Sequence, residues 1–528
     1  MKINRVLIVL SMIAFLLVGQ GTSVSANASA EQALRSPDGR ALIESSDAAG
    51  NGEYNERNGN ALESSFRQPG SVSVLPDGSI VVSDTGNHRL RLLKDGKVSV
   101  YAGPTISLLF EAGLPAGAYA DGKANVSFFH QPMGIFPDAA GNFYIADSGN
   151  HTIRKLDTDG NVTTLAGSGV LGNKDGFGKS ASFYAPHDIA VSNSGTIYVA
   201  DTLNHVIRQI SPDGSVSTLN TPSNRVIEFV PGVVETAGDY VDGPLAMAKF
   251  NEPMGLAIDR LGNLYVSDAG NQRIRYIDFQ KNQVSTVAGS GNYRSQDLYV
   301  EGGYQDGAFA QARFNNPRGI AVDANGGLYI ADSLNHSIRY LRDGIVTTVV
   351  GNPSGEYGAT NGIDEYVLVD RPYDVAVMPN GNLVIADTNN NKIRMIRYFT
   401  LPSGWKANGK VRVLYKNTPI VFDAEPMIRN SRTLVPVRKI AEALGYEVEF
   451  AGNDIFLKGP DRTISMTVGK QAVTRIVKDK LIPSKMDVSP IIEDQRTYVP
   501  VRFFAEEIGI EVDWHEPTTT VILREKTK

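Results

Sequence analysis

The sequence predicts a mainly β protein: a six-bladed β-propeller followed by a small α+β domain made of two similar halves. Two observations support this prediction. A strand-like run, an Asp-x-x-Asn-His turn or close variant, and a second run containing Ile-Arg, or Leu-Arg in the first copy, recur six times between residues 66 and 399. Beyond residue 409, Arg432-Thr-Leu-Val-Pro-Val-Arg438 returns as Arg496-Thr-Tyr-Val-Pro-Val-Arg502. Long repeats rich in short strands are typical of propellers and related repeat architectures.

One repeat shows how each blade is expected to form. Its four short runs are rich in β-branched and aromatic residues and are bounded by Gly, Asn and Asp; they are 250–259, 262–268, 273–277 and 283–289. The short connections predict an antiparallel meander of four strands, which we name a to d. The Asp-x-x-Asn sequence then forms the b–c turn, where Asp and Asn side chains bond to turn amides and Asn tolerates left-handed φ.

The number of b–c turns gives the number of blades. Their first residues are Asp84, Asp147, Asp201, Asp268, Asp332 and Asp387. The sixth copy stops after strand c at Phe399 and supplies no strand d, whereas residues 40–46 precede the first blade at the place of a strand d. We therefore expect the N-terminal segment to complete the last blade, which closes the ring and removes an exposed edge.

This block, residues 31–399, resembles the NHL-repeat family of six-bladed propellers. The resemblance is carried by the six repeats, of which Tyr144-Ile-Ala-Asp-Ser-Gly-Asn-His-Thr-Ile-Arg154 is one of the clearest. It implies the fold. Because members of the family include enzymes, sensors and scaffolds that bind protein or RNA, it implies no single function.

The C-terminal part is predicted as a second domain. Residues 400–409 look like a linker, and residues 410–528 contain the duplicated motif. Each copy starts a short helix after Pro, stops it at Gly445 or Gly509, and continues into an alternating strand. These motifs resemble the copper amine oxidase N-terminal-like domain.

That second resemblance implies an accessory module of secreted bacterial proteins. It does not imply copper here, because His515 is the only histidine after His336 and copper prefers clustered imidazoles. We interpret the domain as an adhesion or envelope-tethering module, with a plain structural spacer as the alternative.

Residues 1–30 are predicted to be a secretory signal peptide. Met1–Arg5 supplies positive charge, residues 6–19 are apolar, and small residues follow, with cleavage expected after Ala26 or Ala30. The apolar run is short for a membrane span. We therefore expect a mature chain without a transmembrane segment that is secreted, extracellular or associated with the cell wall.

Composition narrows the classes of partner. The formal net charge of −6 and the isoelectric point near 5.8 offer no broad basic surface for nucleic acid. The chain has no cysteine, which excludes disulfides and thiolate metal sites and suits export from a monoderm bacterium. We expect a monomer whose partner is a protein, a peptide or a cell-wall glycan.

The histidines and arginines of the repeats are interpreted as structural. One histidine per blade around a ring cannot converge on one ion; these are His88, His151, His205 and His336, replaced elsewhere by Gln272 and Asn391. The repeated arginines are expected to lie along their own blades and to pair with a turn Asp or a carbonyl group. The Asp-Gly pairs at Asp121, Asp175, Asp242 and Asp306 are read as turns, with calcium binding as the alternative.

The candidate binding site lies where each strand a enters the central channel, just after the repeated proline. The blades differ from one another there, as expected where ligand chemistry overrides the repeat. The candidate ligand-binding residues are Met133, His187, Asp188, Met254, Arg318, Tyr373 and Asp374. Blades three and six are opposite in a ring of six, so His187-Asp188 should face Tyr373-Asp374 with Arg318 beside the latter. The alternative is that these are solvated funnel residues.

The same face is predicted to carry two long insertions, residues 219–249 and 290–313. They contain Tyr240, Tyr293, Tyr299 and Tyr304. Long aromatic loops on a rigid ring are favourable recognition surfaces.

The favoured function is that of an exported, non-catalytic binding or scaffold protein, whose propeller recognises a protein, peptide or envelope glycan. The sequence contains no complete catalytic set. The first alternative is a metal-dependent propeller hydrolase or lyase, similar to the lactonase type, with an ion on Asp188 and Asp374. No cofactor is expected, with Ca²⁺ at that site as the alternative. The second alternative is an extracellular ligand sensor.

Overall fold

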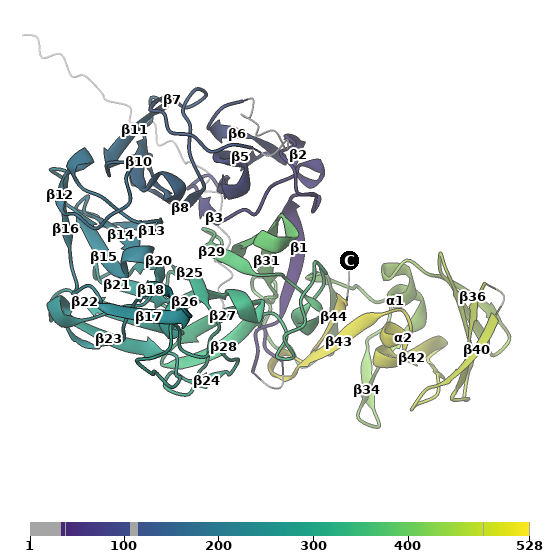
Figure 1. Cartoon of the computed structure of the whole chain (residues 1–528). Helices are drawn as coiled ribbons and strands as arrows, with labels where there is room; N and C mark the ends of the chain where they lie inside the picture. Colours follow the sequence, from purple (N-terminus) through teal and green to yellow (C-terminus); the bar gives the residue numbers. More distant parts are fainter. Residues whose placement is uncertain (1–32, 37–38, 106–114, 479, 527–528) are drawn as a thin grey trace, which may run out of the picture.

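The structure, a computed structural model, describes residues 33–36, 39–105, 115–478 and 480–526. Residues up to 399 form a ring of blades, and the C-terminal residues form a separate lobe beside it (Figure 1). The predicted signal peptide lies outside the described residues. Within the described part of the chain, no helix is long and apolar enough to cross a membrane.

Six antiparallel sheets form the propeller, and their first strands contact one another in sequence around the ring. This confirms the predicted fold. Strands a to d are β3 (Ser71–Val74), β4 (Ile80–Asp84), β5 (Arg89–Lys94) and β6 (Lys97–Ala102) in the first blade, and β8 (Pro132–Pro137), β9 (Phe143–Asp147), β10 (Thr152–Leu156) and β11 (Asn161–Ala166) in the second. They are β13 (Pro186–Val191), β14 (Ile197–Asp201), β15 (Val206–Ile210) and β16 (Ser215–Thr218) in the third blade, and β20 (Pro253–Ile258), β21 (Leu264–Asp268), β22 (Arg273–Asp278) and β23 (Gln283–Ala288) in the fourth. In the fifth blade they are β25 (Pro317–Val322), β26 (Leu328–Asp332), β27 (Ser337–Arg342) and β28 (Ile345–Val350).

These five blades have one strand more than predicted. A two-residue strand pairs with the outer edge of strand d in each: β2 (Gly59–Asn60), β7 (Gly122–Lys123), β12 (Gly176–Phe177), β19 (Gly243–Pro244) and β24 (Gly307–Ala308). Each begins with the glycine that follows an Asp or Asn. The prediction of four strands was therefore incomplete, because two paired residues leave no alternating pattern in a sequence.

The last blade is closed by the N-terminal segment, as predicted. Strand β1 (Ile43–Ala49) pairs antiparallel with β31 (Lys392–Tyr398), beside β30 (Leu383–Asp387) and β29 (Pro372–Val377). The strand starts at Ile43 rather than at residue 40. The reason is that the preceding residues fold back, with the Leu42 amide donating to the Leu34 carbonyl at 2.7 Å.

Apolar side chains fill the space between neighbouring blades. The Ala-x-Phe sequences before strand a contribute a phenylalanine at most 1% exposed to this packing; with the equivalent residues of blades one and two, these are Phe66, Phe129, Phe183, Phe250 and Phe314. These phenylalanines therefore help to hold neighbouring blades together.

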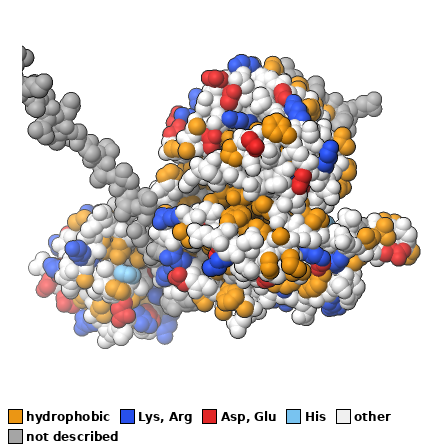
Figure 2. Space-filling model, turned by 90° about the vertical axis from the view of Figure 1, so that its left-hand side faces the viewer, with side chains coloured by type: hydrophobic (Ala, Val, Ile, Leu, Met, Phe, Trp, Pro, Cys, Tyr) orange, Lys and Arg blue, Asp and Glu red, His pale blue; other side chains and the backbone are white. Residues whose placement is uncertain are grey.

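One insertion forms an extra hairpin outside the blades, β17 (Arg225–Val230) and β18 (Val233–Ala237). The imidazole of His205 contacts the Thr236 carbonyl (3.4 Å), so the hairpin lies on the face of the b–c turns. Its valines are exposed, Val234 by 63%. Figure 2, a view of the molecule turned 90° from Figure 1, shows hydrophobic side chains interspersed with basic and acidic ones on the side that faces the viewer.

The C-terminal lobe contains two short helices and three sheets around one apolar core. The helices are α1 (Val437–Ala443) and α2 (Val501–Glu507), each followed two residues later by the predicted glycine, Gly445 or Gly509, with φ near 80°. In sheet order, the strands are β33 (Thr418–Pro419), β32 (Arg412–Tyr415), β44 (Thr520–Glu525) and β43 (Ile510–His515); β34 (Met427–Arg429), β35 (Arg432–Pro436), β42 (Arg496–Pro500) and β41 (Ile491–Glu493); β36 (Glu447–Ala451), β37 (Asp454–Lys458), β38 (Thr463–Thr467), β39 (Ala472–Val477) and β40 (Lys480–Lys485).

The two halves of the lobe are related by a local two-fold axis. Strands β35 and β42 pair antiparallel with Val435 opposite Val499, and these two residues differ by the repeat offset of 64 (499−435). Ion pairs follow the same symmetry, because Arg432 pairs with Asp487 and Arg496 with Asp423. The duplication is therefore a duplication in space as well as in sequence.

The lobe is joined to the last blade by a small buried interface. Ile522 of β44 packs with Leu34, Leu42, Ile363 and Phe399. At its edge the buried Arg524 guanidinium bonds to the Asp364 carboxylate at 2.5 and 3.0 Å, and Asp364 also accepts from the amide of Ile43 in β1 at 2.9 Å. The C-terminal strand is thus tied to the strand that closes the ring.

Candidate binding site at the channel mouth

Each repeated arginine is fully buried within its own blade. Its guanidinium bonds to the Asp that opens the b–c turn at distances between 2.6 and 2.9 Å. A second acceptor, the Asp or Asn before the outer glycine, lies at similar distances. The arginines are Arg91, Arg154, Arg208, Arg275, Arg339 and Arg394. The structural interpretation of these arginines is confirmed. The Asp-Gly pairs are not simple turns: each Asp accepts from the arginine of its blade, and each Gly opens the short outer strand.

The turn histidines connect neighbouring blades. Each b–c turn is a single 3-10 turn that ends on a left-handed residue, as at His205 (φ 57°). The Nδ1 atom of that ring accepts from the Glu252 amide of the next blade at 3.1 Å, and Gln272 replaces it in the fourth blade with its Oε1 2.6 Å from the Asn316 amide. His88, His151 and His336 make equivalent bonds. These residues are therefore structural, as the sequence predicted.

The bond into Nδ1 makes the blade contacts sensitive to acid. Burial lowers the pKa of His205 to about 4, so the folded state resists protonation between pH 6.5 and 4 while the unfolded state accepts the proton. Stability from this group is present above pH 6.5 and is lost as the pH falls to 4, by up to about 3 kcal/mol.

We expect His205→Gln to remove that loss, because Gln272 makes the same bond without titrating. The two proteins should have similar free energies of unfolding in urea at pH 7.5. At pH 4 the variant should have the higher free energy of unfolding. Acidic groups titrate in both proteins and cancel in this difference. If stability depended on pH equally in the two proteins, the acid sensitivity would not come from the His205 imidazole.

The channel mouth brings together the two predicted aspartates. Asp188 accepts from the Ile189 and Leu256 amides, both at 2.8 Å, and Asp374 accepts from the Val72 amide at 3.0 Å and the Ser71 hydroxyl at 2.7 Å. Each carboxylate therefore bonds to the inner strand of the next blade. Burial and repulsion from Asp374 raise the pKa of Asp188 well above its usual range, and burial raises that of Asp374 to about 6.

Neighbouring glycines make room for these carboxylates. A Cβ atom on Gly134 would lie 2.1 Å from Asp188 Oδ1, and one on Gly319 would lie 2.1 Å from Asp374 Oδ1. The Gly residues at the second position of blades two and five are thus explained by the aspartates of blades three and six. The channel positions therefore depart from the sixfold repeat in an approximately two-fold way, with one Gly–Asp pair at Gly134 and Asp188 and the other at Gly319 and Asp374.

This arrangement does not suit calcium, which takes six to eight oxygen ligands. The two carboxylates already accept bonds from backbone amides and a hydroxyl. Among the residues with described positions, no three His, Asp or Glu side chains gather closely enough to hold a metal ion. In the structure, the two aspartates that the sequence offered as candidate metal ligands instead form hydrogen bonds to adjacent blades.

A second group at the mouth is formed by His187, Arg318 and Tyr373. The Arg318 guanidinium lies 3.9 Å from the centre of the Tyr373 ring, and its Nη1 lies 3.5 Å from His187 Nε2. His187 Nδ1 donates to the Met254 carbonyl at 3.2 Å, so Nε2 is the unprotonated nitrogen. Burial and Arg318 lower the pKa of His187 to about 3, so the imidazole is neutral at pH 7.

Arg318 has no carboxylate partner in an ion pair within the described chain. Its Nε donates to the amide oxygen of Asn316 at 2.7 Å, and burial lowers its pKa, which shows the cost of desolvating this cation. All six repeat arginines pair with Asp, so Arg318 differs from them. A half-buried guanidinium with free donors is suited to bind an anionic group.

The two methionines lie at the mouth in different settings. Met254 is 8% exposed and contributes mainly its carbonyl, which holds His187. Met133 is half-buried, with its sulfur 3.6 Å from the Thr85 hydroxyl. Within the described part of the chain, neither methionine forms a hydrogen bond with the Arg318 guanidinium.

The tyrosines of the long insertions are mostly engaged within the propeller. The guanidinium of Arg275 lies 4.9 Å from the Tyr240 ring, and that of Arg339 lies 4.5 Å from the Tyr304 ring. Tyr293 bonds to Asp239. Tyr299, 48% exposed, is the one with a largely accessible ring, so the expected aromatic recognition surface is smaller than predicted.

Comparison with known families agrees with the architecture. The family model described as the NHL repeat matches residues 66–91, 183–210, 250–275, 314–339 and 370–394. The model described as the copper amine oxidase N-terminal domain matches residues 414–523. The chain contains NHL repeats and a copper amine oxidase N-terminal domain. In that domain, His515 Nδ1 lies 2.8 Å from the Thr518 hydroxyl, and one imidazole does not make a copper site.

Relatives of the NHL propeller are distant and longer. The chain is 27% identical over 54% of its length to Protein SUPPRESSOR OF QUENCHING 1, chloroplastic, of Arabidopsis thaliana, covering 26% of that protein. It is 28% identical over 62% of its length to NHL repeat-containing protein 2 of Gallus gallus, covering 46%. It is 28% identical over 56% of its length to Teneurin-m of Drosophila melanogaster, covering 11%. The chain thus spans less than half of each of these three proteins.

Solved structures share the propeller at low identity. An auxiliary nutrient binding protein from Bacteroides thetaiotaomicron matches with a TM-score of 0.46 and 14% identity, over 68% of this chain and 77% of that one. Virginiamycin B lyase from Staphylococcus aureus matches with a TM-score of 0.40 and 12% identity, over 68% and 100%. We draw no functional conclusion from likenesses at this level.

Proposed function

We propose that the protein is an exported binding and scaffold protein whose NHL propeller binds an anionic group of a protein, peptide or envelope glycan at the channel mouth. Arg318 carries this proposal. It is the mouth cation that lacks a carboxylate partner within the described chain, and Tyr373 and Asn316 hold its guanidinium in place. A preorganised guanidinium loses little entropy when it binds a carboxylate.

The surroundings of Arg318 favour binding over chemistry. His187 is neutral and its Nδ1 proton is committed to a carbonyl, and both nearby aspartates bond to backbone amides. The exposed valines of the β17–β18 hairpin offer additional contact area on the same face. The predicted signal peptide supports export, and the C-terminal domain is proposed to hold the propeller at the cell envelope.

Binding of anionic probes to the full chain tests the proposal. The probes are peptides with a free C-terminal carboxylate and oligosaccharides containing uronic acids, each compared with its amidated or neutral counterpart. A probe that binds should stabilise the protein by about 2.7 kcal/mol at a hundredfold excess over its Kd. Thermal unfolding provides the measurement.

We expect Arg318→Gln to abolish this stabilisation. Arg260→Gln is the matched control, because Arg260 is an exposed arginine in the turn between β20 and β21, at the opposite end of strand a from the mouth. Retention of binding in the Arg318 variant, or binding of the amidated and neutral counterparts with equal strength, would refute the role of the mouth cation.

A further inference from the structure

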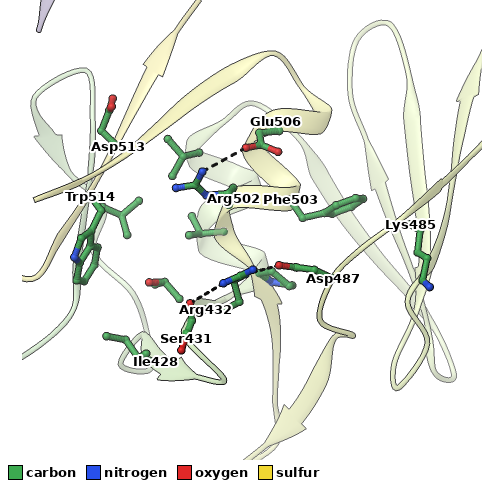
Figure 3. A pocket seen from close by; sticks show the side chains of 15 residues that line it. Ile428, Ser431, Arg432, Lys485, Asp487, Arg502, Phe503, Glu506, Asp513 and Trp514 are labelled. Carbon is green, nitrogen blue, oxygen red and sulfur yellow. Dashed lines mark hydrogen bonds and ion pairs between the residues drawn. The ribbon is translucent and has the colours of Figure 1, made fainter. Parts of the chain in front are cut away.

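A groove of about 670 Å³ opens in the C-terminal domain, away from the channel (Figure 3). It lies between α2, strand β43 and the hairpin of β34 and β35, so both halves of the duplication contribute to it. Its size lies within the range of small-ligand sites, about 300–1,000 Å³. All residues that line the groove belong to the C-terminal domain, so it is a candidate site separate from the channel mouth.

One wall of the groove is aromatic and apolar. Trp514 is 41% exposed, and its indole makes no hydrogen bond or ring contact with another described residue. By contrast, the Trp405 indole donates to the Thr520 hydroxyl at 3.0 Å and lies under Arg412. Val512 lies on the same side of β43 as Trp514, and Val521 is paired with Trp514 across the sheet. Trp514 therefore offers an open ring face with a free N–H donor.

The opposite side of the groove carries paired charges. Arg432 bonds to Asp487, and Arg502 lies 4.0 Å from Glu506 (Figure 3). Each pair offers N–H donors next to carboxylate acceptors. The residues that line the groove include three cations and three carboxylates, so the groove has no net charge to attract an ion.

This combination selects a class of ligand. Neighbouring hydroxyl groups act as donors and acceptors together, and a pair of Arg and carboxylate satisfies both at once. The carbon–hydrogen face of a sugar ring is flat enough to stack on an indole. A charged ligand would instead require an unbalanced set of cations or carboxylates.

We propose that this groove binds a glycan of neutral hexose or N-acetylhexosamine units, with one ring stacked on Trp514 and its hydroxyls bonded to the Arg432–Asp487 and Arg502–Glu506 pairs. The inference deepens the proposed envelope tether, on which it rests, by assigning the tether a site and a ligand class.

The test uses the full chain with two probes, cellotetraose and the tetramer of N-acetylglucosamine, titrated by calorimetry. At least one should bind. Trp514→Ala should weaken binding by about tenfold or more, as expected for an aromatic anchor in a pocket. Arg502→Gln removes the charge but keeps a polar side chain, and it should also weaken binding. Because it leaves Trp514 in place, it guards against a folding defect in the Trp514 variant.

The duplication supplies the matched control. Phe450 is the counterpart of Trp514 at the offset of 64 (514−450) and is 42% exposed, but it does not line the groove. Phe450→Ala should bind the probe as the unmodified chain does. Failure of both tetramers to bind, equal losses in the Phe450 and Trp514 variants, or preferential binding of a hexaglutamate peptide would overturn the proposal.

Sedimentation with isolated cell walls separates this inference from the tether. A chain that binds a tetramer but does not sediment keeps the glycan site and removes the tether. If the Trp514→Ala variant sediments with cell walls to the same extent as the unmodified chain, the domain binds the wall but does so through a site other than the groove.

Discussion

Replacing Arg275 with methionine will lower the free energy of unfolding by about 3–5 kcal/mol, because it leaves the buried Asp268 carboxylate without its cation. The guanidinium bonds to Asp268 and Asp242 at 2.6 Å and to the carbonyls of Val241 and Lys249 at 2.8 and 3.1 Å. Methionine fills part of the space but satisfies none of these acceptors. Urea unfolding at pH 7.5 measures the loss.

The repeat provides a control for this prediction. Blades one and six have Asn58 and Asn361 where the fourth blade has Asp242, and both accept from their arginines. Asp242→Asn should therefore cost less than about 1 kcal/mol, as expected for a partly exposed partner. Equal losses in the two variants would show that the inner and outer acceptors contribute alike, contrary to the burial of Asp268.

Arg524→Met is expected to have a comparable effect, about 3–5 kcal/mol, because two carboxylates lose a buried partner. Arg524 is 1% exposed and bonds to Asp364 and, at 2.7 Å, to Asp513. Asp364 also holds the Ile43 amide, so the loss should reach strand β1. Amide hydrogen exchange of residues 43–49 should become faster than in the unmodified chain.

Arg462→Met is a suitable comparison, since Arg462 pairs with Asp461 within the C-terminal domain and its side chain is 29% exposed. It should leave exchange in β1 unchanged. Unchanged exchange in the Arg524 variant as well would mean that the interface does not support the closing strand.

The sequence predicted the propeller well because its repeats carry their own cues. The turn aspartates count the blades, and the end of the sixth copy at Phe399 reveals the missing strand that β1 supplies. The β39–β40 hairpin was missed, although it extends a sheet by two strands. Its second strand, Lys480–Lys485, is largely exposed, and its apolar residues Leu481, Ile482 and Pro483 are consecutive, so it lacks the alternation that marks a half-buried strand.

The channel mouth was harder to interpret than to locate. The break in the repeat pointed to the channel mouth, and the structure brings His187, Arg318 and Tyr373 together there. What the sequence could not show is that Asp188 bonds to the Leu256 amide of the next blade, because that bond depends on how closely the inner strands approach. Gly134, which leaves space for the carboxylate, was the available signal.

The strand that closes the ring also sets the order of folding. Ile43 pairs with Tyr398, 355 residues later (398−43), whereas most pairs within the other blades are local in sequence. Contacts between distant segments form slowly because a long loop must close first. During synthesis, strand β1 therefore waits for the rest of the propeller to emerge. Until β1 pairs with β31, the last blade has an unpaired outer edge, so we expect ring closure to be the last step in the folding of the propeller.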